Sequence, residues 1–139
     1  MFGISGDPDM KKKYEDCTIE DEEVRMSNTM GTLGMTHSGK PNSRCAGLYI
    51  NFSHNDHLDD HGFVPFGRVV SGWETLAELH KEWYSEMPAK RGFGPNFKQM
   101  ELKGPSYLAK KFPKLSWVEQ ATVVEGPLSG LTDEEAGTD

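Results

Sequence analysis

Cysteine is scarce in this chain of 139 residues, which contains only Cys17 and Cys45. Two cysteines cannot form the disulfide framework of a small secreted domain, although a single bridge between them stays open. Long apolar runs are also missing, and none approaches the roughly 20 residues that a membrane-spanning helix needs. Residues 1–7 contain neither a basic segment nor an apolar stretch typical of a signal peptide. If residue 1 is the natural start, we expect a cytoplasmic protein with reduced thiols.

Positive charge is in deficit, because 15 Lys and Arg residues face 22 Asp and Glu residues. The formal net charge of −7 argues against nucleic acid or an anionic membrane as the main partner. A basic run at 11–13 stands near an acidic run at 20–23, and we interpret both as solvated loop segments. Hydrophobic residues form only 35% of the chain, but three Trp, four Tyr and seven Phe provide large side chains for the core of one domain.

Short apolar runs rich in aromatic and β-branched residues predict three strands, at 31–36, 46–52 and 64–70. Polar and turn-forming residues predict irregular structure between and around them, at 1–30, 37–45, 53–62 and 85–96. Pro65 within the third run predicts an edge strand or a bulge, because proline has no N–H to donate. We expect Phe52, Phe66 and Val69 to face the interior.

The second half of the chain predicts helices and two further strands. Apolar residues recur at helical spacing from Trp73 to Tyr84, which indicates a helix. Phe97–Leu102 and Trp117–Val124 are interpreted as strands, the latter with Val124 inside, and Tyr107–Phe112 as a helical turn after a Gly-Pro pair. Short strands with small helices favour a mainly antiparallel β domain closed as a barrel. This domain would span 1–124, followed by an acidic, flexible tail at 125–139.

A polar loop holds three histidines, His54, His57 and His61, among aspartates. Imidazole and carboxylate groups are ligands for zinc, nickel or copper, so a metal-binding module is one hypothesis. A loop does not fix side chains on one face as a helix does. We therefore prefer a solvated turn and predict neither a metal nor a cofactor.

Five short motifs follow one another in a specific order: Gly31-Thr-Leu-Gly-Met35, Gly39-Lys-Pro-Asn42, Leu48-Tyr-Ile-Asn51, Leu58-Asp59 and Phe66-Gly-Arg-Val-Val70. Each motif alone is weak, whereas all five in this order are specific. The pattern resembles the cyclophilin family of peptidyl-prolyl cis-trans isomerases, and the resemblance runs from Phe2 to Val124. It implies a cyclophilin-like antiparallel β-barrel with flanking helices, and cofactor-free isomerisation of proline-containing peptides or proteins.

The resemblance also implies a proline-binding pocket formed by Thr36, His37, Gly47, Tyr49, His57, Leu58 and Phe63. Tyr49 would be its aromatic floor and Leu58 an apolar wall. Thr36 and His37 match a segment whose backbone pairs with the peptide, and Phe63 lies near the far rim. His57 stands where the family often has an aromatic residue, and Gly47 replaces a glutamine.

Other family features have no counterpart in these 139 residues. The family arginine, which donates to the proline nitrogen in the twisted state, precedes the Gly-Asp pair matched to Gly6 and Asp7. By this match the arginine, a pocket Phe-Met pair, the first two strands and the first helix fall before Met1, and a substrate-anchoring glutamine falls at about Met1. Arg44 is the candidate to replace the arginine.

Two main hypotheses follow from the lack of a match to the family arginine. The first is an isomerase by descent whose activity is weak or lost in this chain. The second is a non-enzymatic subunit that binds proline-containing peptides or serves a structural role. A barrel that lacks strands would also leave edges unpaired, which predicts self-association or a larger assembly.

Overall fold

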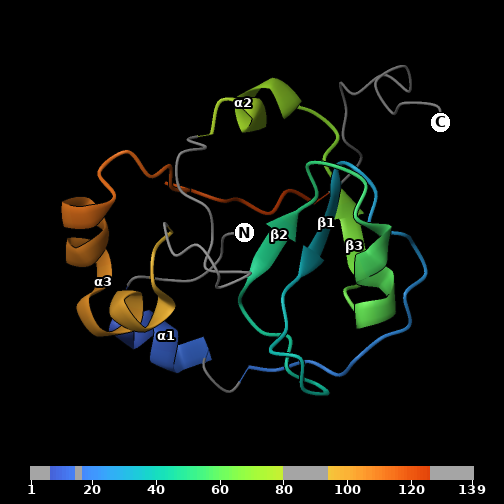
Figure 1. The fold of residues 1–139 in the computed structure, drawn as a ribbon, viewed down its shortest axis with the longest axis horizontal. Helices are drawn as coiled ribbons and strands as arrows, with labels where there is room; N and C mark the ends of the chain where they lie inside the picture. Colours follow the sequence, from blue (N-terminus) through green and yellow to red (C-terminus); the bar gives the residue numbers. More distant parts are fainter. Residues whose placement is uncertain (1–6, 15–16, 80–93, 126–139) are drawn as a thin grey trace.

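The computed structural model describes residues 7–14, 17–79 and 94–125. Their elements follow the order α1 (Pro8–Tyr14), β1 (Thr32–Met35), β2 (Leu48–Ile50), η1 (Asp56–His61), β3 (Pro65–Arg68), α2 (Trp73–Ala77) and α3 (Phe97–Lys111). Helices α1 and α3 contact each other on one side of the molecule, and the sheet and η1 occupy the other side (Figure 1).

The three strands form one antiparallel sheet in the order β2-β1-β3. Leu33 at the centre pairs with Ile50 on one side and with Gly67 on the other. The pairing with β3 shifts register between Leu33 and Gly34, and Pro65 lies on the edge strand of the described sheet. The three predicted strands and the predicted setting of Pro65 are confirmed. A closed barrel is not described by these residues.

One face of the sheet is buried against a polar interior. Thr32 and Gly34 point inward from β1, and Tyr49 and Asn51 do so from β2 and its end. Because strand side chains alternate between faces, Phe52 lies on the opposite face from Asn51. It is 47% exposed and contacts the Trp73 ring at 5.4 Å between centroids.

Two other apolar residues also lie outside, contrary to the prediction of an interior position. Phe66 is 57% exposed and Val124 is 75% exposed, whereas Val69 is half-buried. Val124 ends the strand predicted at Trp117–Val124. That prediction is wrong, because these residues form no strand and are exposed. A β-prone run needs a partner strand to pair with, and none is described beside it.

The prediction of irregular structure in the first 30 residues missed α1. The Asp7 carboxylate accepts a hydrogen bond from the Asp9 N–H at 2.9 Å, and Pro8 occupies the first helical position. Both features favour helix initiation. The predicted loop at 53–62 likewise contains the 3-10 helix η1, which ends at Gly62 with a left-handed φ of 75°.

The predicted helix at Trp73–Tyr84 begins where expected. The helix ends at Ala77, so Glu78 and Leu79 are not helical. Residues 80–84 lie outside the described residues. Residues 85–93 of the predicted loop and 126–139 of the predicted tail lie outside them too.

Helix α3 replaces the strand predicted at Phe97–Leu102. The Asn96 side chain caps its start by accepting from the Gln99 N–H at 2.9 Å. Gly104, at φ 56° and ψ −146°, breaks the helix ahead of Pro105, and the predicted helical turn forms its second half. No helix among the described residues is long and apolar enough to cross a bilayer.

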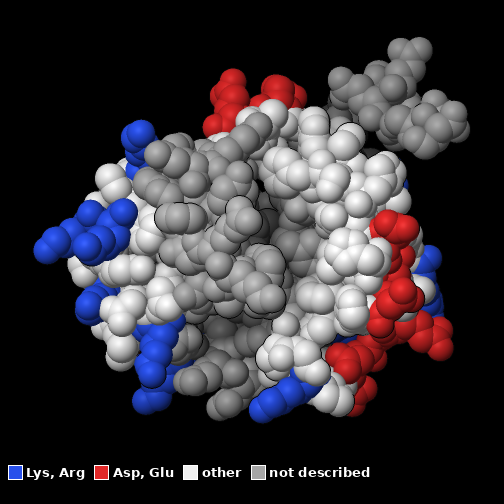
Figure 2. Space-filling model, viewed as in Figure 1, with Lys and Arg blue, Asp and Glu red and all other residues white. Residues whose placement is uncertain are grey.

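Charge is distributed unevenly over this fold. Figure 2 shows most Lys and Arg side chains over the side that carries α1 and α3, and most Asp and Glu side chains along the opposite edge and near α2. Exposed lysines on the basic side include Lys12, Lys13, Lys98, Lys110 and Lys111. Lys12 and Lys13 are exposed as predicted, but they lie in helix α1 and not in a loop. Residues 20–23 are exposed too, and Glu22 of this run also bonds to Arg44.

Candidate functional site

The ends of β1 and β2 hold two of the predicted pocket residues together. The Thr36 N–H donates to the Gly47 carbonyl at 2.8 Å, which extends the pairing of the two strands by one step. A Cβ at position 47 would overlap the Thr36 hydroxyl, so a larger residue here would force the Thr36 side chain to move.

Three aromatic rings meet beside this pair. Phe63, between η1 and β3, lies 4.2 Å from the His37 ring between centroids, tilted by 42°. Its ring is also 5.7 Å from the Tyr49 ring in an edge-to-face arrangement at 78°. Aromatic pairs favour these separations and angles. The structure therefore joins a residue after β1, a residue of β2 and a residue before β3 in one cluster.

Leu58 and His57 come from η1. The Leu58 carbonyl accepts a hydrogen bond from the Phe63 N–H at 3.2 Å, so the backbone connects Leu58 to the ring cluster. Leu58 is half-buried, whereas His57 is exposed. The structure brings six of the seven predicted residues into one neighbourhood, and His57 has no described contact with them.

Asn28 was not predicted as a site residue, and it organises this cluster. Its side chain is fully buried, with 0% exposure. Its Nδ2 donates to Asp59 Oδ1 at 2.6 Å and to the Phe63 carbonyl at 2.8 Å, and its Oδ1 accepts from the Tyr49 hydroxyl at 2.7 Å. One amide therefore connects Tyr49, Phe63 and η1.

Asn51 extends the same buried network. Its Nδ2 donates to Asn28 Oδ1 at 3.0 Å and to Thr32 Oγ1 at 2.8 Å, and its Oδ1 accepts from Asn55 Nδ2 at 2.8 Å. Buried amides are tolerated when such bonds are complete. The sequence signal was an asparagine inside the apolar run Leu48-Tyr-Ile-Asn-Phe52, but nothing in that run identified Asn28 as its partner.

The Tyr49 ring lies directly over β1. A Cβ at Gly34 would overlap the Tyr49 hydroxyl and ring, so the close approach depends on glycine. Burial, followed by the negative charge of Asp59, raises the pKa of Tyr49 to about 12. The phenol therefore stays neutral and serves as a hydrogen-bond donor.

Asp59 is the charged member of the network. Its Oδ2 accepts from the Ser27 hydroxyl at 2.5 Å, and its Oδ1 accepts from the Asn28 N–H at 2.9 Å. Hydrogen bonds from Ser27 and Asn28 lower the pKa of this carboxyl from its ordinary value of 3.8, against a smaller opposing effect of burial. The Asp59 carboxylate is therefore ionised at neutral pH and connects η1 to Ser27 and Asn28.

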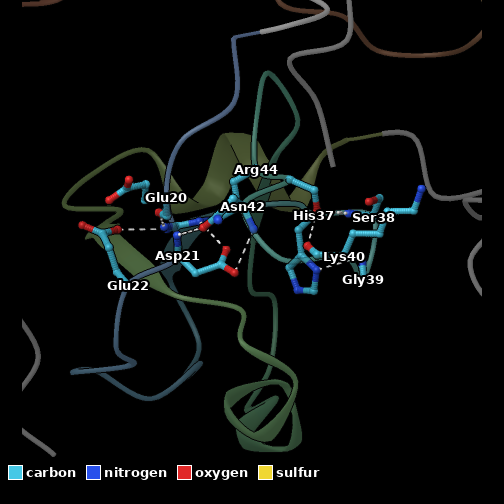
Figure 3. A network of polar contacts seen from close by, with 10 residues as sticks. Glu20, Asp21, Glu22, His37, Ser38, Gly39, Lys40, Asn42 and Arg44 are labelled. Carbon is cyan, nitrogen blue, oxygen red and sulfur yellow. Dashed lines mark hydrogen bonds and ion pairs between the residues drawn. The ribbon is translucent and has the colours of Figure 1, made fainter.

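Arg44 belongs to a second polar network, on the loop between β1 and β2 (Figure 3). It is 3% exposed, and its guanidinium donates to Glu22 Oε2 at 2.9 Å and to the Glu20 carbonyl. Asp21 and Asn42 exchange two backbone-to-side-chain bonds of 2.8 and 2.9 Å beside it. These bonds hold the side chain of Arg44, the residue suggested from sequence as a replacement arginine, on the acidic segment at 20–22.

The same loop shapes the surroundings of His37. The Gly39 N–H donates to His37 Nδ1 at 3.0 Å (Figure 3). A neutral imidazole that accepts at Nδ1 carries its proton on Nε2. In the described structure this Nε2 is buried and has no hydrogen-bond partner.

The histidine-rich segment forms part of η1 and its approach. His54, His57 and His61 are all exposed. Among the described residues, no three His, Cys, Asp or Glu side chains converge as metal ligands would. The fit to a metal ion is therefore poor here.

Comparison with known proteins adds evidence from outside the structure. Residues 3–93 match the family described as "Cyclophilin type peptidyl-prolyl cis-trans isomerase/CLD". A protein of Homo sapiens named "Peptidyl-prolyl cis-trans isomerase-like 3" is 35% identical over 79 residues, which are 57% of this chain and 46% of that protein. A "Peptidyl-prolyl cis-trans isomerase" of Acinetobacter baylyi is 30% identical over 86 residues, or 56% of this chain and 46% of that protein. The chain thus spans about half the length of the curated relatives it matches.

Proposed function

Because the chain belongs to the cyclophilin-type peptidyl-prolyl cis-trans isomerase family, we propose that it binds proline-containing peptides at the cluster of His37, Tyr49 and Phe63. The observation that carries this proposal is the convergence of the three rings from separate segments, with centroid separations of 4.2 and 5.7 Å. Apolar surfaces with a few fixed polar groups are the usual form of a small ligand site.

The proposed chemistry needs no cofactor and no covalent step. Rotation about a prolyl peptide bond faces a barrier of about 20 kcal/mol, because resonance gives the bond double-bond character. The aromatic edges of Tyr49 and Phe63 would grip the pyrrolidine ring, with Leu58 beside them. Backbone groups at Thr36 and Gly47 would hold the flanking peptide. Catalysis then requires a donor that acts only in the twisted state.

We further propose that this 139-residue chain isomerises prolyl bonds slowly. No residue of its sequence matches the family arginine, and Arg44 is held by Glu22 and the Glu20 carbonyl. Loss of one preorganised donor typically lowers the rate by about 10²–10³. The same observation favours the second candidate function, a non-enzymatic subunit that binds proline-containing segments.

The proposal extends to the architecture and assembly. We interpret the β2-β1-β3 sheet as part of the family's antiparallel barrel, within a domain at 1–124. Both outer strands of the described sheet have an unpaired edge. Such edges pair readily with other strands, which supports self-association or a larger assembly.

Titration of the isotope-labelled chain with an Ala-Pro peptide, followed by NMR, tests binding. We expect chemical-shift changes clustered at 35–37, 47–49 and 58–63, because these segments carry the ring cluster. Phe63→Leu should weaken binding by about tenfold or more, the usual effect of truncating an anchor residue. Trp117→Leu, at a ring that is 74% exposed and outside the cluster, is the matched control. Shifts elsewhere, or equal affinity of the two variants, would overturn the assignment.

A protease-coupled isomerisation assay on the same chain tests the rate. Weak acceleration that is unchanged in Arg44→Met would agree with the proposal. Turnover at the level of full-length relatives would show that another group replaces the arginine, and the slow-rate proposal would then be wrong.

A further inference from the structure

The two cysteines of the chain, 28 positions apart in sequence, meet at the end of α1. Both are free thiols, with Cys17 exposed and Cys45 half-buried. Cys17 Sγ donates to the Lys13 carbonyl at 3.6 Å, and Cys45 Sγ donates to the next carbonyl, that of Tyr14, at 2.7 Å. The two thiols therefore bond to consecutive carbonyl groups, those of the last two residues of α1.

A third bond limits the separation of the two residues. The Cys17 N–H donates to the same Tyr14 oxygen at 3.2 Å. Two bonds of 3.2 and 2.7 Å to one atom keep Cys45 Sγ within about 6 Å of the Cys17 nitrogen. Residues that a disulfide links are close neighbours of this kind, with about 4.4–6.8 Å between their Cα atoms.

Backbone pairing brings the two segments together independently of the thiols. Ile19 and Arg44 form an antiparallel bridge, in which the Ile19 N–H donates to the Arg44 carbonyl at 3.1 Å. In antiparallel pairing, the residues just before Ile19 run alongside those just after Arg44. The Asp21–Asn42 bonds fix this register two steps further along. The backbone therefore keeps the segments that carry Cys17 and Cys45 next to each other.

We propose that Cys17 and Cys45 form a reversible intramolecular disulfide, with a low-molecular-weight disulfide such as oxidised glutathione as the oxidant. The exposed Cys17 thiolate attacks one sulfur of the oxidant, and the other sulfur leaves as a thiolate that takes up a proton. The Cys45 thiolate then attacks the Cys17 sulfur of the mixed disulfide and displaces the second thiol. Two protein thiols lose two protons and two electrons, and one oxidant disulfide becomes two thiols.

The bond would act on the loop between β1 and β2. In the reduced chain, Arg44 and the Asp21–Asn42 pair hold this loop on residues 19–22 through hydrogen bonds and ion pairs. The loop begins at His37, whose ring contacts Phe63, and ends at Gly47, whose carbonyl accepts from the Thr36 N–H. A covalent link at Cys45 would restrain one side of the candidate peptide site and restrict the unfolded chain.

Oxidation of the full 139-residue chain tests the proposal. After incubation with oxidised glutathione, we expect a monomer that has lost both reactive thiols, carries no adduct and yields a linked Cys17–Cys45 peptide on non-reducing digestion. Its Tm should exceed that of the reduced chain by about 5 °C or more. Cys45→Ser should stop at the mixed disulfide and carry one glutathione adduct on Cys17, and neither Cys45→Ser nor Cys17→Ser should show such a rise.

Three results would overturn the proposal. They are separate glutathione adducts on the two cysteines, a link between two chains, or a linked monomer with a lowered Tm. None of these readouts uses a prolyl peptide, so a failure of peptide binding would affect the proposed function alone.

Discussion

At the scale of single residues, the Asn28 side chain connects parts of the molecule that are far apart in sequence. Its amide bonds reach Tyr49 in β2, Asp59 in η1 and the Phe63 carbonyl. Without the amide, the Tyr49 hydroxyl and the Phe63 carbonyl would each lose a hydrogen bond, and Asp59 would keep only its bonds from Ser27 and the Asn28 N–H. The arrangement of the candidate site thus depends on a residue that is not itself part of the ring cluster.

Replacing Asn28 by Ala should lower the free energy of unfolding by about 2–3 kcal/mol, because it leaves buried polar groups unpaired. Urea denaturation followed by Trp fluorescence measures this change. Gln120→Ala, an exposed amide, is the control and should change stability by less than about 0.5 kcal/mol. Equal effects of the two substitutions would show that the Asn28 bonds contribute nothing.

The lowered pKa of Asp59 predicts a pH dependence of stability. Since the folded-state pKa lies below the unfolded value, the carboxylate stabilises the fold at neutral pH. This contribution is present above about pH 4 and is lost as pH falls through the folded-state pKa. The Tm difference between the native chain and Asp59→Asn should therefore shrink from pH 7 toward about pH 2. A constant difference would mean that the ionised form is not the stabilising one.

The raised pKa of Tyr49 predicts the opposite dependence at high pH. The folded state favours the neutral phenol, so this stabilisation is present below pH 10.0 and is lost as pH rises toward about 12. In an ultraviolet titration of tyrosinate, Tyr49→Phe should remove the step near pH 12 and leave the other tyrosines unchanged. Loss of amplitude near pH 10 instead would place the Tyr49 hydroxyl in water.

At the scale of elements, the contact between β1 and β2 depends on the absence of a side chain at Gly34. Gly34→Ala should destabilise the fold by about 1–3 kcal/mol, because the added methyl group overlaps the Tyr49 ring. Gly67→Ala, on β3, is the matched control, since its Cβ would lie 3.7 Å from Leu33 in ordinary contact. Thermal melts of both variants measure the difference, and equal melts would contradict the close packing of Tyr49 on β1.

The elements that sequence predicted correctly are those with an unambiguous local pattern. The aromatic and β-branched content of the short apolar runs identified the three strands. The motif order selected six residues that the structure places together. Phe97–Leu102 was misinterpreted because Phe97, Met100 and Leu102 fit either a strand or a helix, and the Asn96 cap decides for a helix. The Asn28 network was missed because long-range hydrogen bonds leave no periodic signal in the sequence.

At the scale of the whole molecule, two polar networks join the N-terminal half of the chain to the sheet. The Asn28 network lies under the sheet, and the Arg44 network holds residues 19–22 on the loop between β1 and β2. No residue of α1 or α3 takes part in the hydrogen bonds described for these two networks. Among the described residues, the networks therefore connect the sheet to residues 20–28 and 59.

Arg44→Met should release this loop. We expect the Ile19 amide, which donates to the Arg44 carbonyl, to exchange its hydrogen at least about tenfold faster, because charged hydrogen bonds contribute about 1.5–3 kcal/mol. Arg68→Met, at an exposed position on β3, is the control. Hydrogen exchange followed by NMR measures both, and unchanged protection of Ile19 would show that the segment is held by other contacts.

The cluster of His37, Tyr49 and Phe63 is the proposed binding site for proline. Isotope-filtered NOE spectroscopy of the labelled chain with an unlabelled Ala-Pro peptide tests this role most directly. We predict NOEs from the pyrrolidine protons to the rings of Tyr49 and Phe63. NOEs to the surface ring pair Phe52 and Trp73 instead, with none to the cluster, would contradict it.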